Sequence, residues 1–410
     1  MENKEEFKIK NVETLPDGWK RVKLGEVLEE RDERVGNAEL EPVAIGVQGV
    51  RKRNEIYYKD LSENYSNNKV FKYGFVAFGL GTNEMAIGVN VLNEDFCVSP
   101  AYKVFEIKNG DAIFFQYFVN FIKILFGNKF LTVSARQGKS IDFKWFLQEN
   151  VILPPLPEQK KITEILETVD NVIEKTDAII GKYKRIKQGL MQDLLTKGID
   201  EKGQIRSEQT HKFKDSPLGR IPEEWEVVRL GEVGDIFDSK RIPLDGEYRS
   251  NIKGEFPYCG ATGIIDYIND YIFDGEFVLI AEDGGKFNRF EDTAYLMMGK
   301  FWANNHVHIV FGKADFLNNA FLQYFINYED VSSYISGSTR EKLNQRLLKN
   351  IILPLPPLPE QQRIAEILSQ IDETIEKEIQ YKEKLERLKN GLMEDLFTGK
   401  VRVNNLVKEE

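Results

Sequence analysis

The stretch PPLPEQ at residues 154–159 occurs a second time, unchanged, at residues 356–361. The likeness continues beyond it, because nearly half of residues 160–198 are identical to their counterparts at 362–400. A match of this length within one chain is typical of a tandem repeat. The sequence therefore predicts two copies of one structural unit, each ending in the segment that follows the prolines.

The beginnings of the two copies also match. The sequence LPDGWKRVKLGEV at residues 15–27 corresponds to IPEEWEVVRLGEV at residues 221–233. Between the matching ends, residues 28–96 and 234–301 share little sequence, although both are rich in aromatic residues, glycine and alternating apolar pairs. We infer that the two copies share a scaffold and differ in the surface that it presents.

Each copy ends in a predicted long helix, because apolar residues follow the prolines at alternating steps of four and three, the spacing of a coiled-coil seam. Each helix is expected to begin just after Pro157 or Pro359. The carboxylate of Glu158 or Glu360 in the first turn then interacts favourably with the positive end of the helix dipole. A helix of roughly 38 residues extends about 57 Å, which is longer than a compact domain needs. We therefore predict that the apolar sides of the two helices pack against each other as a coiled coil. The predicted seam consists of Ile162, Leu166, Val169, Ile173 and Ile180 in the first helix and Ile364, Leu368, Ile371, Ile375 and Leu385 in the second, with Thr176 and Glu378 as polar interruptions that help fix the register.

The segments between the matching ends read as mixed strand and helix, so the predicted fold class is α+β. Strands are expected at residues 74–78, 102–107, 276–280 and 307–310, and short helices at 114–126 and 318–328. Residues 199–220 read as a polar linker because they contain glycine, serine and many charges. The predicted boundaries are 1–153 for the first globular domain, 154–198 for the first long helix, 199–353 for the linker and second domain, and 354–410 for the second long helix and tail.

Composition excludes several classes of protein. The 410 residues carry a net charge of −10 and a pI near 5.2, which argues against a chain that is basic throughout and binds nucleic acid everywhere. Two cysteines without C-x-x-C spacing and three histidines without a partnering cluster argue against disulfide frameworks and zinc sites. Because no run of 18 apolar residues exists and the first 20 residues are highly charged, we expect neither a membrane span nor export, and a cytoplasmic location.

A catalytic site would need suitable residues, and the best candidate is Glu106-Ile107-Lys108 downstream of Asp95, which loosely resembles a nuclease metal site. The counterpart in the second copy is Phe311-Gly312-Lys313, which has no carboxylate. His306 and His308 lie two residues apart, but the sequence offers no third metal ligand beside them. The sequence therefore predicts a chain that binds rather than catalyses.

Basic clusters beside amide or aromatic groups are the candidates for contact with DNA, since Arg and Lys contact phosphates and guanine edges. Two of these clusters occupy the same place in their repeats, shortly before the proline stretch, and both stay basic inside an acidic chain. The candidate residues are Arg51, Lys52 and Arg53, Arg136 and Lys139, Lys240 and Arg241, Lys286 and Arg289, and Arg340, Lys342 and Arg346.

These repeated motifs resemble the specificity subunits of type I restriction-modification systems. The resemblance rests on three paired motifs that cover essentially the whole chain: P-x-x-W-x-x-x-x-L-G-E at residues 16–26 and 222–232, L-P-E-Q-x-x-I at 156–162 and 358–364, and G-L-M-x-D-L at 189–194 and 391–396. In that family each variable domain recognises one half of a bipartite double-stranded DNA target. The resemblance implies that the two long helices form an antiparallel coiled coil, which separates the domains and sets the spacing between the half-sites.

The same resemblance implies the partners. Two methyltransferase subunits are expected to dock on the helices, and motor nuclease subunits can join them. S-adenosylmethionine, ATP and Mg²⁺ are expected in those partner subunits, with no cofactor on this chain. Two alternatives stay open: a noncatalytic coiled-coil adaptor whose globular ends bind proteins, and a self-sufficient nuclease that depends on Glu106.

Overall fold

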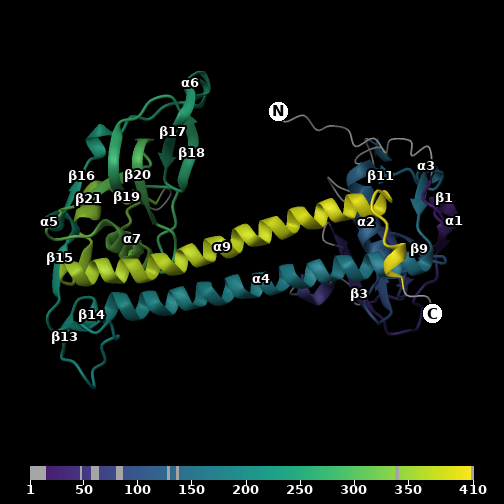
Figure 1. The fold of residues 1–410 in the computed structure, drawn as a ribbon, viewed down its shortest axis with the longest axis horizontal. Coiled ribbons are helices and arrows are strands. Elements are labelled where there is room, and N and C mark those ends of the chain that lie inside the picture. Colours follow the sequence, from purple (N-terminus) through teal and green to yellow (C-terminus); the bar gives the residue numbers. More distant parts are fainter. Residues whose placement is uncertain are drawn as a thin grey trace. The chain divides into compact units, whose positions relative to one another are not determined.

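The computed structural model describes residues 15–46, 49–56, 64–79, 86–126, 130–134, 138–337 and 341–407. The chain divides into two compact units. Unit 1 comprises Met1–Thr176 and Tyr381–Glu410, and unit 2 comprises Asp177–Gln380. Each unit contains one globular domain, here named domain 1 or domain 2, and one half of each of two long helices (Figure 1). The boundary between the units therefore crosses both helices rather than a linker.

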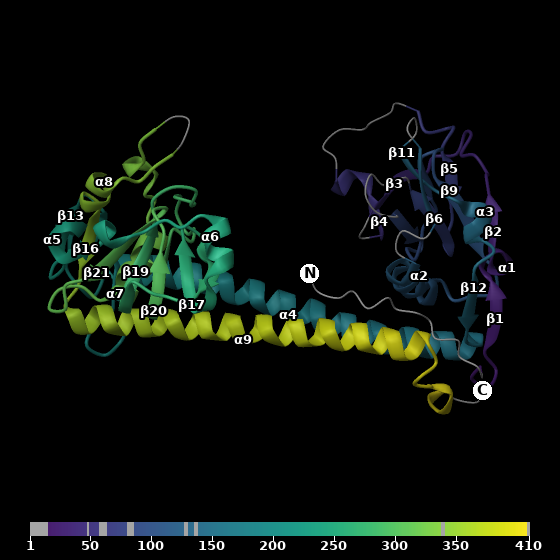
Figure 2. The same ribbon diagram turned by 90° about the horizontal axis from the view of Figure 1, so that it is seen from above.

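Domain 1 contains two four-stranded sheets and several short helices (Figure 2). Its elements are β1 (Lys20–Lys23), α1 (Leu24–Val27), β2 (Leu28–Arg31), β3 (Glu41–Gly46), β4 (Gly49–Lys52), β5 (Lys69–Phe71), β6 (Phe75–Gly79), β7 (Ala86–Val89), β8 (Phe96–Val98), β9 (Lys103–Ile107), α2 (Ala112–Phe126), β10 (Leu131–Ser134), β11 (Gly138–Ile141), α3 (Phe143–Phe146) and β12 (Asn150–Leu153). A short 3-10 helix at Arg53–Glu55 follows β4. The first sheet has the strand order β2-β9-β6-β7 and the second β4-β3-β8-β5.

Domain 2 is built on one six-stranded sheet with the order β16-β21-β19-β20-β17-β18. Its elements are β13 (Phe213–Ser216), β14 (Gly219–Pro222), β15 (Glu226–Arg229), α5 (Leu230–Val233), β16 (Gly234–Ile236), α6 (Gly246–Asn251), β17 (Lys253–Gly260), β18 (Gly263–Ile268), β19 (Phe273–Ala281), β20 (Ala294–Ala303), β21 (Val307–Gly312), α7 (Asn319–Tyr328), α8 (Gln345–Lys349) and β22 (Ile352–Leu355). Short 3-10 helices lie at Asp238–Lys240 (η2) and Ser332–Tyr334.

The two domains share a scaffold. In both, an antiparallel pair at the base (β1 with β12, β15 with β22) joins the start of the domain to its end. In both, four antiparallel strands follow the same connectivity, since β2-β9-β6-β7 corresponds to β16-β21-β19-β20. What differs is the addition: domain 1 adds its second sheet, whereas domain 2 extends the shared one through parallel pairing of β17 with β20. The predicted α+β class and the predicted strands and short helices are confirmed.

The shared sheet is buried on both faces, because its strands alternate between two clusters of apolar residues. In domain 1, Val76 and Phe78 of β6 face the cluster that includes α2, whereas Phe75 and Ala77 face the second sheet. In domain 2, Val278 and Ile280 of β19 face α7, and Leu279 lies in the cluster on the other face. Burial on both faces explains why these strands read as nearly continuous apolar runs.

The two long helices are α4 (Leu156–Thr196) and α9 (Leu358–Phe397), and their ends pair in antiparallel fashion within each unit. In unit 1, Ile162 and Leu166 near the start of α4 share a buried cluster with Leu396 near the end of α9. In unit 2 the roles reverse, as Leu194 near the end of α4 shares a cluster with Leu368 near the start of α9. The predicted antiparallel helix pair is confirmed. Of the predicted seam, Ile162, Leu166, Ile180, Ile364, Leu368 and Ile375 are buried, and Val169, Ile173, Ile371 and Leu385 are half-buried.

In each unit a buried carboxylate at the start of a long helix joins segments that are far apart in the sequence. In unit 1, Glu158 accepts hydrogen bonds from Trp19 Nε1 (2.9 Å) and from Nε and Nη2 of Arg402 (2.8 and 2.9 Å). Burial raises the pKa of Glu158, but the hydrogen bonds from Arg402 and Trp19 outweigh it and hold the pKa below its ordinary value. Trp19 belongs to domain 1, Glu158 to α4 and Arg402 to the segment after α9, so one carboxylate joins three segments.

The same arrangement occurs in unit 2. Glu360, at the start of α9, accepts hydrogen bonds from Trp225 Nε1 (3.2 Å) and Arg206 Nη2 (3.1 Å). Gly198 leaves α4 with a positive φ of 63°, and a Cβ there would lie 2.2 Å from Glu360 Oε1. Only glycine therefore fits this turn. The two glutamates do more than the predicted stabilisation of a helix end, because each forms a buried ion pair.

A second set of three residues fixes each domain on the helix pair. In unit 1, Tyr117 of α2 donates to Asp170 of α4 (2.6 Å), which also pairs with Lys389 of α9 (2.6 Å). In unit 2, Tyr324 of α7 donates to Asp372 of α9 (2.8 Å), which pairs with Lys187 of α4 (2.6 Å). These ion pairs between the helices depend on helix register.

The predicted polar interruptions behave differently from these ion pairs. Thr176 is buried and donates its hydroxyl to Val172 O within the same helix (2.8 Å), and Glu378 is half-buried. Two further expectations need correction. The long helices begin at Leu156 and Leu358, one residue before Pro157 and Pro359. Residues 199–220 are not a simple linker, because they contain β13 and the start of β14 and the buried Arg206.

Candidate nucleic-acid interface

The basic segments ahead of the proline stretches occupy equivalent places in the two domains. In domain 1 the segment is the hairpin β10–β11, followed by α3, whose first turn is capped by Asp142 (Trp145 N to Oδ1, 3.0 Å). In domain 2, Ser336 and Lys342 form an antiparallel bridge, and α8 follows with Asn344 as its cap (Leu347 N to Oδ1, 3.1 Å). A loop followed by a capped short helix is thus present in both copies, although the sequences differ.

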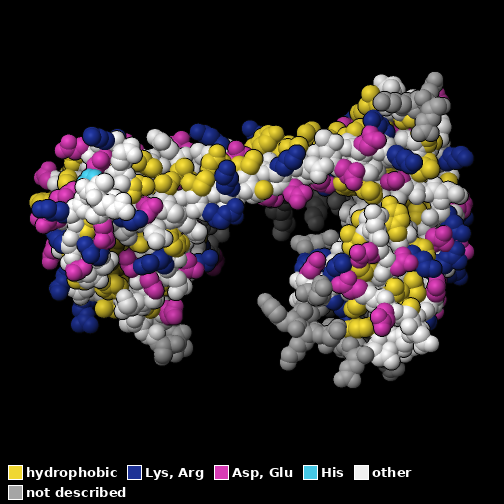
Figure 3. All heavy atoms as spheres, turned by 90° about the horizontal axis from the view of Figure 1, so that it is seen from below, with side chains coloured by type: hydrophobic (Ala, Val, Ile, Leu, Met, Phe, Trp, Pro, Cys, Tyr) yellow, Lys and Arg dark blue, Asp and Glu magenta, His cyan; other side chains and the backbone are white. Residues whose placement is uncertain are grey.

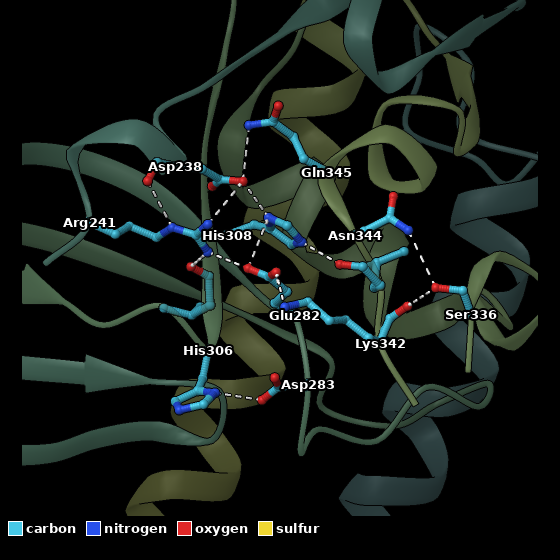
Figure 4. Close-up of polar contacts among 12 residues, drawn as sticks. Asp238, Arg241, Glu282, Asp283, His306, His308, Ser336, Lys342, Asn344 and Gln345 are labelled. Atoms are coloured by element: carbon cyan, nitrogen blue, oxygen red, sulfur yellow. Dashed lines mark hydrogen bonds and ion pairs between the residues drawn. The ribbon is translucent and has the colours of Figure 1, made fainter. Parts of the chain in front are cut away.

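In domain 2 this segment is held by a buried polar cluster, drawn in Figure 4. His308 of β21 is fully buried, with Nδ1 2.6 Å from Asp238 Oδ2 and Nε2 2.6 Å from the carbonyl oxygen of Leu343. Glu282, just after β19, receives Lys342 Nζ at 2.8 Å on one oxygen and Arg241 Nη1 at 2.6 Å on the other. The segment is therefore tied to the sheet through both its backbone and a lysine side chain.

Neighbouring cationic and hydrogen-bonding groups lower the pKa of both carboxylates of the cluster. Burial raises the pKa of Asp238, but the hydrogen bond and charge of His308 and the charge of Arg241 outweigh burial and hold that pKa below its ordinary value. Burial likewise raises the pKa of Glu282, and hydrogen bonds from Lys342 and Arg241 outweigh it, so that this pKa is also lowered. Gln345 Nε2 donates a further hydrogen bond to Asp238 Oδ2 (3.1 Å).

The structure separates the predicted contact residues of domain 2 into two groups. Arg241 is mostly buried: it is paired with Glu282 and donates to Val307 O (2.8 Å), so it supports the cluster and is not available to a phosphate. Lys342 is paired with Glu282, although its side chain is 44% exposed. Lys240, Lys286, Arg289 and Arg346 are exposed. Of these, Arg289 lies 3.6 Å from Glu329. Arg340 lies outside the described residues.

In domain 1 the predicted residues are dispersed. Arg51 is exposed, whereas Lys52 next to it is paired with Glu41 (2.9 Å). Arg53 lies with its guanidinium over the ring of Tyr65, 5.9 Å from the centroid. Arg136 lies outside the described residues, and Lys139 belongs to β11 but its side chain lies outside the described set.

The nuclease candidate of the sequence is engaged in ion pairs. Glu106 of β9 accepts a hydrogen bond from Arg31 Nε (2.9 Å), and Lys108 is paired with Glu29. Among the described residues, no group of three His, Cys, Asp or Glu side chains is arranged to hold a metal ion. The geometry at Glu106 is that of cross-strand pairing between β2 and β9.

Sequence reasoning missed Asp238 and Glu282, the two carboxylates on which the cluster depends. Each is separated from His308 by more than twenty residues, and nothing in the local pattern joins them. A usable signal existed: His306 and His308 lie in or beside one predicted strand, and a buried histidine needs hydrogen-bond partners. Figure 3 shows basic and acidic side chains intermixed over the visible face of each unit.

Comparison with known proteins gives the family. The model of the type I restriction modification DNA specificity domain matches this chain twice, at residues 16–182 and 222–387. Each match covers one domain with much of the long helix that follows it.

No helix in the described part of the chain is long and apolar enough to cross a bilayer.

Relatives of known name carry the same designation. The chain is 33% identical to the type I restriction enzyme MjaVIII specificity subunit of Methanocaldococcus jannaschii, over 65% of each chain. It is 41% identical to the putative type I restriction enzyme specificity subunit S.HindORF215P of Haemophilus influenzae over 35% of this chain and 36% of the relative. The match to the putative MjaX specificity subunit of M. jannaschii has 27% identity and covers 97% of both. The matched parts thus span about two thirds of the first relative and a third of the second.

Solved structures agree on the fold. A chain from a structure of the type I R-M system superposes with a TM-score of 0.56 at 20% identity, covering 95% of this chain and all of that one. The type I restriction-modification S subunit from M. genitalium gives the same TM-score at 14% identity, covering 94% of this chain and 98% of that one. With both domains and both long helices matched, this chain belongs to the type I restriction-modification DNA specificity family and contains two copies of its domain.

Proposed function

We propose that this chain recognises an asymmetric, bipartite DNA sequence, with each domain contacting one half, and that it catalyses no reaction itself. The observation that carries the proposal is the contrast within the repeat. The two domains share four strands and the position of the loop ahead of α3 or α8, yet the loops differ in sequence. Because one scaffold presents different side chains at equivalent places, the two half-sites are expected to differ.

Exposed cations support contact with the DNA backbone. In domain 2, Lys240, Lys286, Arg346 and Lys349 are exposed, and the last two lie on α8, directly after the basic segment. Such side chains contact phosphates and fix the position of a protein on a duplex without reading its sequence. The net charge of −10 opposes binding elsewhere on the surface, so contact with a polyanion is expected to be local.

The test is an exchange of domains in cells. The chain is co-expressed with its methyltransferase, and the modified sequence is found by methylome sequencing. Replacing domain 2 by that of another family member should change one half of the modified sequence and leave the other half unchanged. A sequence that stays the same, or that changes in both halves, contradicts the assignment of one half-site to each domain.

Two methyltransferase subunits are part of the proposal, and the long helices offer two equivalent surfaces for them. Ile179 and Ile186 of α4 occupy the same repeat positions as Tyr381 and Leu388 of α9, and all four are between 38% and 52% exposed. Figure 3 shows hydrophobic side chains along the surface of these helices. An apolar stripe repeated on two solvent-facing helices is typical of an interaction site.

A glycine marks each of these surfaces. Gly189 and Gly391 lie inside the helices, where glycine destabilises by roughly 1 kcal/mol relative to alanine. A Cβ at either position would contact nothing within 4 Å. The chain therefore has no internal reason for these glycines, whereas a partner that approaches the helix backbone closely would require them.

This docking surface can be tested without DNA. Gly189→Leu and Gly391→Leu should each reduce the number of bound methyltransferase subunits from two to one in native mass spectrometry, and the double variant should bind none. Gly181→Leu is the matched control, since Gly181 lies in α4 but its repeat counterpart is Glu383. Two bound subunits in the double variant would remove these glycines from the interface.

S-adenosylmethionine, ATP and Mg²⁺ belong, in this proposal, to the methyltransferase and any motor nuclease subunits. The cytoplasmic location predicted from the sequence is part of the same proposal, because the chromosomal target lies there. The adaptor alternative is not favoured, since the family to which both domains belong is defined by DNA specificity.

A further inference from the structure

Domain 1 is attached to the long helices at two separate points. The first is the contact of Trp19 with Glu158, and the second is the contact of Tyr117 with Asp170. Asp170 follows Glu158 by twelve residues in α4, which corresponds to about 18 Å along the helix. A single attachment point would allow the domain to tilt, whereas two points at this separation fix its angle to the helix axis.

Domain 2 is attached in the same way to the other helix. Trp225 donates to Glu360 near the start of α9, and Tyr324 donates to Asp372, which again follows by twelve residues. Because the same side chains recur at the same spacing along α4 and α9, the attachment at two points is a property of the repeat and not of one domain.

The second attachment point also includes a lysine from the opposite helix. In unit 1, Lys389 Nζ of α9 lies 2.6 Å from Asp170 Oδ1 and 5.1 Å from the centroid of the Tyr117 ring. In unit 2, Lys187 Nζ of α4 lies 2.6 Å from Oδ1 of the corresponding aspartate and 5.4 Å from the centroid of the tyrosine ring. Each tyrosine therefore fixes its domain to both helices at once.

The tyrosine hydroxyl supplies a direction that the neighbouring apolar contacts lack. The rings of Phe114 and Phe121 in α2 lie 5.3 and 5.2 Å from that of Phe397 in α9, and apolar contacts of this kind are not directional. A hydrogen bond weakens steeply when its geometry changes. Burial and the adjacent Asp170 raise the pKa of Tyr117, so its hydroxyl stays protonated and donates.

The position of α7 reaches the basic segment of domain 2 through the sheet. Helix α7 shares a buried cluster with Val278 and Ile280 of β19. Glu282, directly after β19, binds Lys342 through its side chain (2.8 Å) and accepts a hydrogen bond from Leu343 N at its carbonyl oxygen (2.8 Å). Because α8 follows this segment, a tilt of α7 on α9 is expected to displace α8 as well.

We propose that Tyr117 and Tyr324 are positioning residues that determine how strictly the complex distinguishes the length of the DNA spacer. Each hydroxyl holds its domain at one angle on the helix pair, so that the two half-sites are recognised at one separation. Without the hydroxyl a domain stays attached at its tryptophan but can tilt, and a displacement of about 3.4 Å equals one base-pair step. This inference rests on the proposed function.

The test uses random-sequence duplex DNA selected by the complex of this chain with its methyltransferase. With the unmodified chain, the selected sequences should contain two half-sites at one spacer length. Tyr117→Phe and Tyr324→Phe should each keep both half-sites and add spacers one base pair longer or shorter. The preference for the original length should fall at least roughly tenfold in each variant, which corresponds to about 1.4 kcal/mol, and further in the double variant.

Tyr295→Phe is the matched control. The hydroxyl of Tyr295 donates to Gly260 O (2.7 Å), so this substitution removes a hydrogen bond inside domain 2 and leaves the contact of Tyr324 with Asp372 in place. The unfolding midpoint should fall, whereas the spacer length should not change. A broader range of spacers in Tyr295→Phe would mean that any loss of stability has this effect, and would overturn the proposal.

The outcomes separate the two hypotheses. One spacer length in Tyr117→Phe, in Tyr324→Phe and in the double variant overturns the positioning role and leaves the proposed function standing. Changed bases within a half-site also overturn the positioning role, because the tyrosine would then act on recognition inside its domain. If the unmodified chain selects no sequence with two half-sites, the proposed function itself is contradicted.

A second pair of variants covers a failure to fold, which thermal unfolding reports. Lys389→Met and Lys187→Met leave both tyrosines in place and remove the cation that holds each aspartate between the helices. Their side chains are 25% and 22% exposed, so methionine can replace them at the surface of the helix pair. The same broader range of spacers is expected, and a single spacer length in both variants overturns the proposal.

Discussion

Substitution of Glu158 by glutamine should destabilise unit 1 strongly, because it removes one member of a buried ion pair. The carboxylate accepts from Trp19, from two nitrogens of Arg402 and from the backbone N–H of Val403, and its side chain is only 2% exposed. Removal of one partner from a buried pair destabilises by about 3–5 kcal/mol. Arg402 is 23% exposed and can be hydrated again, so about 3 kcal/mol is expected.

Calorimetric unfolding is the assay. For a unit of about 200 residues, 1 kcal/mol lowers the midpoint by roughly 2–4 °C, so the transition of unit 1 should fall by about 6–12 °C. Glu360→Gln is the matched variant in unit 2. Its partner Arg206 is only 7% exposed but keeps a second ion pair with Glu224 (2.8 Å), so the loss there should be similar, about 3 kcal/mol.

A double-mutant cycle separates the ion pair from other effects of the substitution. Glu158→Gln with Arg402→Met should destabilise by at least 1 kcal/mol less than the sum of the single changes, because the double variant leaves no uncompensated charge. Additivity within about 0.5 kcal/mol, or a loss below 1 kcal/mol for Glu158→Gln alone, would refute this account of how unit 1 is closed.

Three further predictions concern pH, salt and length. The pKa of Glu158 is lower in the folded chain than in the unfolded chain, so its contribution to stability is present above the unfolded-state pKa and is lost as the pH falls through the folded-state pKa. Unit 1 of the unmodified chain should therefore lose stability below about pH 4.5 more steeply than unit 1 of the Glu158→Gln variant. The measurement is the unfolding midpoint as a function of pH in the acid range. Arg346→Ala should weaken DNA binding and reduce the slope of log affinity against log salt by about 1, whereas Lys377→Ala on α9 should change neither; an unchanged slope for Arg346→Ala would exclude a phosphate contact. Inserting seven residues after Lys182 and after Lys384 lengthens each helix by about 10 Å, or about three base-pair steps, so methylome sequencing should find the same half-sites with a longer spacer, and an unchanged spacer would contradict the helices as the determinant of spacing.

Much of the architecture could be predicted from sequence because its determinants are local and occur twice. The repeated apolar spacing predicts α4 and α9. Short apolar runs between turn residues predict strands such as β6 and β21. The resemblance to a known family then supplied the antiparallel pairing, which the buried clusters of each unit confirm.

The interactions that close the structure could not be predicted in the same way. Arg206 and Arg402 have equivalent roles but do not align in the repeat, since each follows its helix at a different distance. Glu158 was interpreted as a residue that stabilises a helix end, because a sequence shows its neighbours along the chain and not the tryptophan in space. For the same reason the sequence places Arg241 among the candidate DNA contacts, although Glu282 holds it inside the domain.

The core of domain 1 is completed by residues 393–403, and this has a consequence for the synthesis of the chain. Domain 1 leaves the ribosome first, yet its core includes Met393, Leu396, Phe397 and Val403 from the far end of the chain. At roughly 5–20 residues per second, the nascent domain waits on the order of ten to fifty seconds for these groups. During that interval its apolar surface is open to chaperones and proteases, so a product that ends before Arg402 and Val403 is one that cellular quality control can recognise.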